Sequence, residues 1–280
     1  MITAAPVYAF AGTEHTGKQL AAIEAYLDEL TMRRIRELDL PPGGSCWEIG
    51  AGGGSVATRL ARDIVPHGRV AATDLDISRL TPEGNLHIHR ADVAADAPPP
   101  GGPWQLIHAR LVTQHLPQRR ELIPTLAAQL APGGWLLLGE FDCQTPPRVI
   151  TAAGADVAEL FDSFIRTLLG VLTARGVDLA WASQVHAAMV RAGLTDVHSL
   201  RYVESWTGGG YGCQLLDANS HQQHEALLHA GLRPTQLDRV RGLLQDPDFT
   251  VTSYPFVSVR GRRPTDAQPV PAAGTAGDQR

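Results

Sequence analysis

Short apolar runs alternate with helical patterns between residues 45 and 141, and this alternation constrains the fold more than any other feature. Strands are predicted at residues 46–49, 69–73, 86–89, 104–109 and 134–141, with helices at 56–64 and 117–130. The last run is almost continuously apolar, as expected for a strand buried on both faces of a parallel sheet. The alternation therefore predicts βαβ units and an α/β domain.

Further helices are predicted on both sides of this core. An amphipathic helix is expected at residues 16–38, where Thr16 and Gln19 have the form of a capping box. After the core, the patterns predict helices at 155–174, 180–192, 214–228 and 235–244, and strands at 197–206 and 249–259. We expect a helical cap at 1–40, one domain at 41–262 with helical insertions near 150–176 and 207–246, and a disordered tail at 263–280.

Composition excludes several classes of protein. The chain has 280 residues, 44% of them hydrophobic, and a net charge of −5, which excludes disorder for most of its length. Cys46, Cys143 and Cys213 lie far apart, so a disulfide framework is not expected and a reducing cytoplasm is predicted. No apolar run approaches the roughly 18 residues of a membrane helix. The acidic balance argues against a nucleic-acid partner.

A glycine cluster lies between the first strand and the helix that follows it. Gly50, Gly52 and the two glycines after them would let a ligand approach the backbone beside the positive end of a helix. The nicotinamide dinucleotide fingerprint places its third glycine where this chain has Ser55. Glu48, two residues before Gly50, is also foreign to that fingerprint. The turn therefore predicts a nucleotide site that departs from the nicotinamide pattern.

Acidic residues end the first three strands of the predicted sheet. Glu48 ends the first strand, Asp74 the second, and Asp92 follows the third. Asp74 lies where an acid can bind the hydroxyls of an adenosine ribose, and Asp92 could accept a hydrogen bond from an adenine amino group. Because these strand ends meet at one sheet edge, the three acids predict an adenosine site there.

With these motifs the chain resembles the class I S-adenosylmethionine-dependent methyltransferases. The resembling stretches are residues 47–55, 72–76, 108–110 with 115–117, and 130–134 leading to 138–142. The flanking helices resemble those of small-molecule methyltransferases of actinobacterial secondary metabolism. The resemblance implies a Rossmann-like class I methyltransferase fold, with a seven-stranded, mostly parallel sheet flanked by helices, an N-terminal helix and helical insertions. It also implies S-adenosyl-L-methionine as the cofactor.

The resemblance assigns roles to residues of this chain. The implied cofactor-binding set is Glu48, Gly50, Ala51 and Gly52 at the methionine end, Asp74 and Leu75 at the ribose and adenine, Asp92 and Val93 at the adenine edge, and Ala109 and Arg110 beside the methionine portion. His115, after the fourth strand, is a candidate general base, with a loop-capping role as the alternative. Glu140, at the end of the fifth strand, could orient an acceptor, with a structural role equally open.

Two histidine pairs have spacings that raise the question of a metal. His87 and His89 share one face of a predicted strand, and His221 and His224 share one face of a predicted helix. Zinc sites need three or four ligands, and no acid or cysteine at ligand spacing completes either pair. We therefore predict no metal site.

The leading hypothesis is in-line SN2 transfer of a methyl group from S-adenosylmethionine to a small organic acceptor, expected to be a secondary metabolite. Oxygen is the favoured accepting atom, followed by nitrogen and carbon. The alternatives are an NAD(P)-dependent oxidoreductase on the same sheet, and a cyclase or binding protein that keeps the fold without methylating. We expect no nucleic-acid or membrane partner, and a homodimer stays open.

Overall fold

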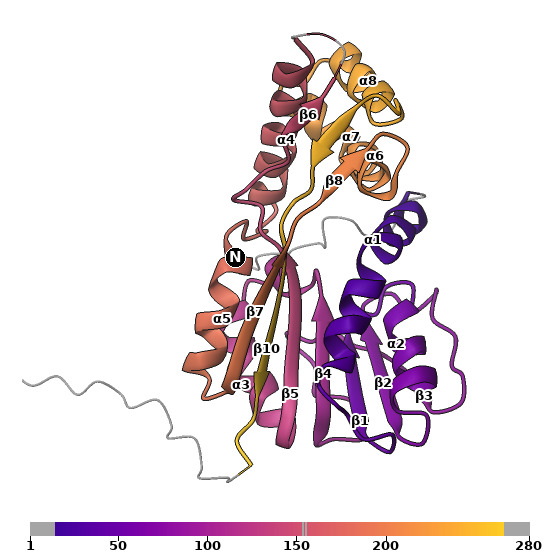
Figure 1. The fold of residues 1–280 in the computed structure, drawn as a ribbon, viewed down its shortest axis with the longest axis vertical. Helices are drawn as coiled ribbons and strands as arrows, with labels where there is room; N and C mark the ends of the chain where they lie inside the picture. The colour runs from indigo at the N-terminus through magenta and orange to yellow at the C-terminus, as the bar shows by residue number, and fades with distance from the viewer. Residues whose placement is uncertain (1–14, 153, 155, 266–280) are drawn as a thin grey trace, which may run out of the picture.

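The computed structural model describes residues 15–152, 154 and 156–265, and it has a main sheet of seven strands. These are β1 (Ser45–Ile49), β2 (Arg69–Asp74), β3 (Leu86–Arg90), β4 (Trp104–Arg110), β5 (Leu130–Phe141), β7 (Thr195–Tyr202) and β10 (Phe256–Arg262). Their order is β3-β2-β1-β4-β5-β10-β7 (Figure 1). Neighbours among β1 to β5 pair in parallel, whereas β10 is antiparallel to both β5 and β7. The predicted α/β fold with a mostly parallel sheet is confirmed.

Helices cover both faces of this sheet. They are α1 (Thr16–Arg36) and α2 (Ser55–Arg59) on one face, and α3 (Arg119–Gln129) and α5 (Trp181–Arg191) on the other. Met32 of α1 shares an apolar core with Cys46 and Leu106, which point to the first face. Trp181 of α5 shares a second core with Trp47, from the opposite face. Successive residues of β1 therefore belong to two separate apolar cores, one on each face of the sheet.

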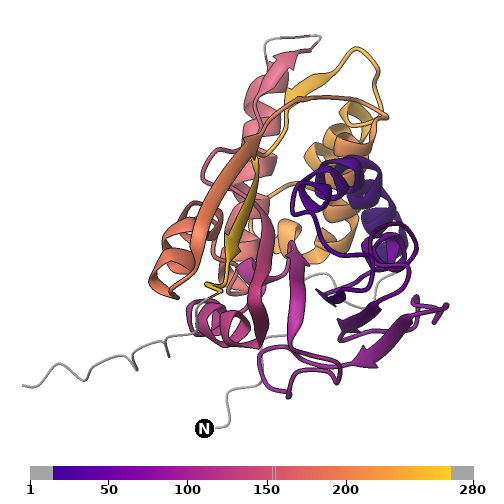
Figure 2. The ribbon, with the colours of Figure 1, turned by 60° about the horizontal axis from the view of Figure 1, so that its bottom comes forward.

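A second unit lies beyond the carboxyl ends of the parallel strands (Figures 1 and 2). We call it the lid. It contains α4 (Asp156–Ala174), α6 (Tyr211–Gln222), α7 (His224–His229), α8 (Pro234–Leu243), and an antiparallel sheet of β6 (Val149–Thr151), β9 (Thr250–Thr252) and β8 (Ser205–Thr207). Phe164, Trp206 and Phe249 form its core, which Tyr26 and Leu27 of α1 join. Helix α1 therefore packs against both the main sheet and the lid.

Two strands predicted as single runs each divide between the two sheets. The predicted strand at 197–206 is β7 in the main sheet and β8 in the lid, separated by Val203 and Glu204. The predicted strand at 249–259 is likewise β9 and β10. Side chains alternate with a period of two along a strand of either sheet. The sequence pattern therefore could not show where the chain passes from the main sheet to the sheet of the lid. β6 was not predicted, and a small sheet of β6, β9 and β8 lies at the edges of the insertions expected to be helical.

The two ends of the described chain also differ from expectation. Helix α1 begins at Thr16 as predicted, but its N-cap residue is His15. Gln19 donates a hydrogen bond to Asn219 of α6 at 2.8 Å, so the predicted capping box is wrong. The N–H of Arg263 donates to the carbonyl of Gly134 at 2.8 Å, which holds the first part of the predicted tail against β5. Residues 266–280 of that tail lie outside the described residues.

Candidate cofactor and acceptor site

The glycine turn between β1 and α2 is held against its neighbours by backbone contacts. Gly50 and Gly52 have φ angles of 66° and 56°, a region that side chains rarely adopt. The N–H groups of Gly50 and Ala51 both donate to the carbonyl of Thr73 on β2, at 2.8 and 3.1 Å. A Cβ on Gly50 would lie 2.3 Å from Cγ2 of Val112, so the close approach of the segment after β4 requires glycine here.

Asp74 connects the glycine turn to the end of β2. One of its carboxylate oxygens accepts the N–H of Gly52 at 2.8 Å, and the other accepts the N–H of Asp76 at 3.0 Å. The side chain of Asp74 stays partly exposed, so lone pairs of its oxygens can still accept from a ligand. Leu75, the next residue, leaves 51% of its surface exposed. A carboxylate and an open apolar surface thus lie side by side, as an adenosine group requires.

Asp92 and Val93 follow β3, the strand beside β2. Asp92 accepts the N–H of Ala94 at 2.9 Å, and its own N–H donates to Asp96 at 2.8 Å, so the turn after β3 is fixed. Both side chains are partly exposed. The parallel register of Asp74 with Arg90 brings the ends of β2 and β3 to one edge. Contact of Asp92 and Val93 with an adenine stays a prediction.

Glu48 lies beneath the glycine turn. Nδ1 of His108 on β4 is 2.6 Å from one of its oxygens, and the two side chains are 3% and 2% exposed. The parallel pairing of β1 with β4 places the two residues opposite each other. The carboxylate of Glu48 is therefore used inside the protein, although the residue stands at the position that the sequence motif indicates.

Arg110 joins the end of β4 to helix α1. Its guanidinium forms an ion pair with Asp28 at 2.9 Å and donates to the hydroxyl of Thr31 at 3.1 Å. Asp28 also accepts from the hydroxyl of Ser55 at 3.2 Å, so one carboxylate links α1 to β4 and to the start of α2. Ala109 is fully buried. These contacts fix α1 above the turn, and a role of Ala109 and Arg110 toward the methionine portion stays a prediction.

Two further residues of α1 cover the glycine turn, and neither was predicted as a site residue. A Cβ on Gly52 would lie 2.9 Å from a methyl carbon of Leu20, and a Cβ on Gly53 would lie 2.2 Å from Oε1 of Glu24. The helical period placed Leu20 on the apolar stripe of α1, but it could not show that the stripe meets a turn more than 30 residues later.

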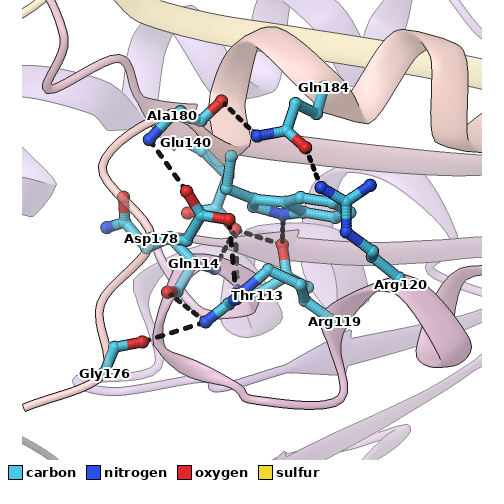
Figure 3. Close-up of polar contacts among 10 residues, drawn as sticks. Thr113, Gln114, Arg119, Arg120, Glu140, Gly176, Asp178, Ala180 and Gln184 are labelled. Atoms are coloured by element: carbon cyan, nitrogen blue, oxygen red, sulfur yellow. Dashed lines mark hydrogen bonds and ion pairs between the residues drawn. The ribbon is translucent and has the colours of Figure 1, made fainter.

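Glu140 supports the segment that follows β4, as Figure 3 shows. One of its oxygens accepts the N–H of Thr113 at 2.7 Å, the hydroxyl of the same residue, and the N–H of Gln114 at 3.3 Å. The indole of Trp181 donates to the Thr113 hydroxyl at 2.7 Å. Glu140 is fully buried, and burial raises the pKa of its carboxyl to about 7, although the bonds from Thr113 and Gln114 lower it. Among the described residues its second oxygen has no hydrogen-bond partner.

The same segment is tied to the loop before α5. The carbonyl of Gln114 accepts from the N–H of Asp178 at 3.0 Å and from the guanidinium of Arg119 at 3.3 Å. Arg119 also donates to the carbonyl of Gly176 at 2.9 Å and pairs with Asp178 at 3.5 Å (Figure 3). Thr113 and Gln114 are therefore fixed by the nearby Arg119 and by groups of β5, α5 and the loop before α5 that lie far away in the sequence.

His115 ends this segment in a single 3-10 turn, Thr113–His115. Burial, with the charge of Arg119 adding to it, lowers the pKa of the imidazole to about 4. The ring is therefore neutral near pH 7 and offers a lone pair, but it holds a proton weakly. Its Nε2 lies 3.4 Å from the amide nitrogen of Gln114. Whether it acts as a base stays a prediction.

These site features agree with a comparison to known proteins. Residues 21–206, more than half of the chain, match the family described as methyltransferase domain. The chain belongs to this family, and its fold is that of the class I S-adenosylmethionine-dependent methyltransferases. The match favours this cofactor over the nicotinamide that the sheet architecture alone left open. It begins within α1 and ends within β8, so α6, α7, α8 and β10 lie outside it.

Individual relatives match over shorter stretches. Methyltransferase str3 of Strobilurus tenacellus is 29% identical over 136 residues, which cover 48% of this chain and 49% of that protein. The 27-O-demethylrifamycin SV methyltransferase of Amycolatopsis mediterranei is 30% identical over 152 residues, or 50% of this chain and 54% of that protein. The chain therefore spans about half the length of the curated relatives it matches.

A solved structure with the same fold carries ligands. Phosphoethanolamine N-methyltransferase 2 of Haemonchus contortus, bound to phosphomonomethylethanolamine and S-adenosylhomocysteine, has a TM-score of 0.54 and 15% identity to this chain. The alignment covers 92% of this chain and 60% of that one. At this identity the likeness concerns the fold.

The residues at the sheet edge fit S-adenosylmethionine. Asp74 presents a partly exposed carboxylate where a ribose would bind, and Leu75 presents apolar surface for an adenine. In the glycine turn beside them Gly53 is exposed, while Leu20 and Glu24 of α1 lie against Gly52 and Gly53. Within the described residues, no three His, Cys, Asp or Glu side chains gather to hold a metal ion. No helix in that part of the chain is both long and apolar enough to cross a membrane.

Proposed function

We propose that the protein transfers a methyl group from S-adenosylmethionine to a small organic acceptor, with oxygen as the preferred accepting atom. The observation that carries the proposal is the enclosure of the cofactor edge. Helix α1 lies over the glycine turn, and its Tyr26 and Leu27 also pack into the core of the lid with Trp206. An edge enclosed on two sides favours a small acceptor over the surface of a macromolecule.

A relative supports the choice of oxygen and of a secondary metabolite. The Amycolatopsis protein is named as a methyltransferase of 27-O-demethylrifamycin SV, so its named acceptor is an oxygen of a small molecule. We extend that preference to this chain, with nitrogen and then carbon as the next accepting atoms. The net charge of −5 supports the same class of acceptor, because a nucleic-acid partner would favour a basic surface.

When bound, S-adenosylmethionine supplies a methyl group that its sulfonium sulfur already activates. In an in-line SN2 transfer, the lone pair of the acceptor would bond to the methyl carbon, and the electron pair of the carbon–sulfur bond would stay on sulfur. The protein contributes mainly alignment, which can supply on the order of 7–11 kcal/mol. Asp74 and Leu75 would hold the adenosine end. Neutral His115 would accept the proton that leaves the acceptor. Glu140 is a positioning residue in this proposal, because it fixes Thr113 and Gln114 ahead of His115.

The test is transfer of a deuterated methyl group. The protein is incubated with trideuteromethyl-labelled S-adenosylmethionine and a panel of small alcohols, phenols, carboxylic acids and amines, and products are detected by mass spectrometry. We expect labelled methyl on an oxygen acceptor. Labelled product only on amines would overturn the oxygen preference. Cofactor binding without transfer to any acceptor would instead favour a cyclase or binding protein on this fold.

The setting of the activity is part of the same proposal. We propose a cytoplasmic enzyme with a small-molecule partner and no nucleic-acid or membrane partner. Cys46, Cys143 and Cys213 are buried free thiols, which suits a reducing compartment. Light scattering coupled to gel filtration would determine whether a homodimer forms, and fractionation of cells would test the location.

A further inference from the structure

The acid of the sequence motif is not available at the glycine turn. Glu48 is 3% exposed, and its carboxylate lies 2.6 Å from Nδ1 of His108. Cys46, two residues earlier and therefore on the same face of β1, belongs to the core beneath α1 and α2. This face of β1 is buried inside the protein. A cofactor ammonium group at the turn would have to reach a carboxylate that is already buried and bonded.

A different carboxylate touches the turn from above. Oε1 of Glu24 would lie 2.2 Å from a Cβ on Gly53, so it is in direct contact with the backbone that the glycine leaves bare. Leu20, one helical turn earlier on α1, covers Gly52 in the same way. The carboxylate of Glu24 is therefore held at the methionine end of the site, where the sequence motif led us to expect Glu48.

Glu24 is held in place, but Arg110, whose guanidinium acts on its charge, is paired with a neighbouring carboxylate. Asp28, one turn later on α1, takes the ion pair with Arg110 and the hydrogen bond from Ser55. Among the described residues Glu24 forms no ion pair of its own. Burial and the charge of Asp28 raise the pKa of Glu24, which Arg110 and Ser55 offset only in part. A cation placed at this point would relieve both unfavourable effects.

We propose that Glu24, and not Glu48, is the carboxylate that binds the α-ammonium group of S-adenosylmethionine. The ion pair of Asp28 with Arg110 fixes the helical turn that carries Glu24, so α1 is part of the cofactor site as well as its cover. This inference rests on the proposed function, because it names a further binding residue of the same site.

Two ligands separate the ammonium contact from the rest of the cofactor. S-adenosylhomocysteine carries the amino-acid end, and 5′-methylthioadenosine lacks it while keeping the adenosine and the sulfur. Their affinities are measured by isothermal titration calorimetry for the natural protein and for Glu24→Gln, Glu48→Gln and Glu29→Gln. Glu29 is the matched control, since it lies on the same helix, is 75% exposed and pairs with Arg59.

We expect Glu24→Gln to weaken the binding of S-adenosylhomocysteine by about tenfold or more, as for a lost bond between charged groups. The affinity for methylthioadenosine should stay unchanged. Glu29→Gln should change neither affinity. Glu48→Gln should lower the melting temperature of the ligand-free protein and keep the ratio of the two affinities. The melting temperature of each variant shows whether it is folded before titration.

Three results would overturn the inference. Glu24→Gln could weaken the binding of both ligands equally, or of neither. Either result would show that Glu24 does not contact the ammonium group. Glu48→Gln could alone reduce the ratio of affinities, which would return the role to the motif acid. A natural protein that binds neither ligand would refute the cofactor site and the proposed function together, whereas an unchanged ratio in Glu24→Gln refutes only this inference.

Discussion

Two neighbouring parts of the same sheet edge are held in different ways. At the cofactor side, backbone N–H groups of the glycine turn bond to Thr73 and Asp74 on the adjacent strand. At the side that we propose for the acceptor, which we call the acceptor side, the segment after β4 is held by the side chains of Glu140 and Trp181, which come from β5 and α5. The first side is held by backbone groups that bond to the neighbouring parallel strand, whereas the second is held by single side chains from other elements. Substitutions should therefore affect cofactor binding on one side and folding on the other.

The largest effect is expected for Glu140→Ala. The change leaves the buried N–H groups of Thr113 and Gln114 without their acceptor and opens a cavity, so it should lower the free energy of unfolding by about 2–4 kcal/mol. Urea unfolding followed by circular dichroism measures this. Glu225→Ala, at a side chain that is 94% exposed, is the control and should change stability little. Equal stability of the two variants would refute the supporting role of Glu140.

The sequence predicted the first side of this edge much better than the second. The position of Asp74 follows from the end of a periodic strand, and parallel pairing then places it beside the turn. The role of Glu140 could not be predicted in the same way. Its partners lie 26 and 27 residues earlier, and the third member of the cluster, Trp181, lies 68 residues from Thr113. No local period relates such positions.

The division of the strands between two sheets could not be predicted for a similar reason. The alternating pattern runs on from β7 into β8, and from β9 into β10. The pairing of β8 with β9, and the contacts of Trp206 and Val251 with the lid core, show that β8 and β9 belong to the small sheet. Glu24 is the corresponding case within the site. Its helix was predicted, but its contact with the turn depends on how α1 is oriented against the sheet.

Asp74→Ala is the strongest test of the cofactor side. It removes the carboxylate proposed to bind the ribose, so S-adenosylhomocysteine should bind about 2–3 kcal/mol more weakly, roughly 30- to 150-fold. Calorimetry measures the affinity. Asp76→Ala, two residues later in the exposed loop after β2, should bind as the natural protein does. Equal weakening in both variants would show that the loop, rather than the carboxylate of Asp74, determines binding.

The pH dependence of stability gives the next test of the acceptor side. Burial raises the pKa of Glu140 from its ordinary 4.5 to about 7, so the folded protein binds the extra proton between these values. Its contribution is fully present below pH 4.5 and is lost as the pH rises to 7. Compared with Glu140→Gln, the natural protein should lose up to about 1.4 kcal/mol of unfolding free energy per pH unit in this window. Parallel curves for the two proteins would contradict the raised pKa.

His115 should act in the opposite direction. The pKa of its imidazole falls from 6.5 to about 4 on folding, so the unfolded chain binds the proton between these values. Its contribution is present above pH 6.5 and is lost as the pH falls toward 4. His115→Gln should flatten the acid side of the stability curve, whereas His67→Gln, at an exposed residue, should not.

The smallest effect returns to the cofactor side, at Leu75. Its side chain is 51% exposed in a position where the resemblance to the methyltransferases places an adenine, so ligand binding should cover apolar surface that folding leaves open. Leu75→Ser should therefore weaken the binding of S-adenosylhomocysteine by about 1 kcal/mol, roughly a fivefold loss of affinity. Because this surface is not part of a core, the stability of the ligand-free protein should stay the same.

The control for Leu75 separates a ligand contact from a general effect of exposed leucines. Leu200 on β7 is 40% exposed and lies at the opposite edge of the sheet, so Leu200→Ser should leave both affinity and stability unchanged. If Leu75→Ser lowers stability and leaves affinity intact, Leu75 supports the loop after β2 and does not contact adenine. The cofactor side would then need a tertiary support of its own, as the acceptor side has in Glu140, and the contrast between the two sides would disappear.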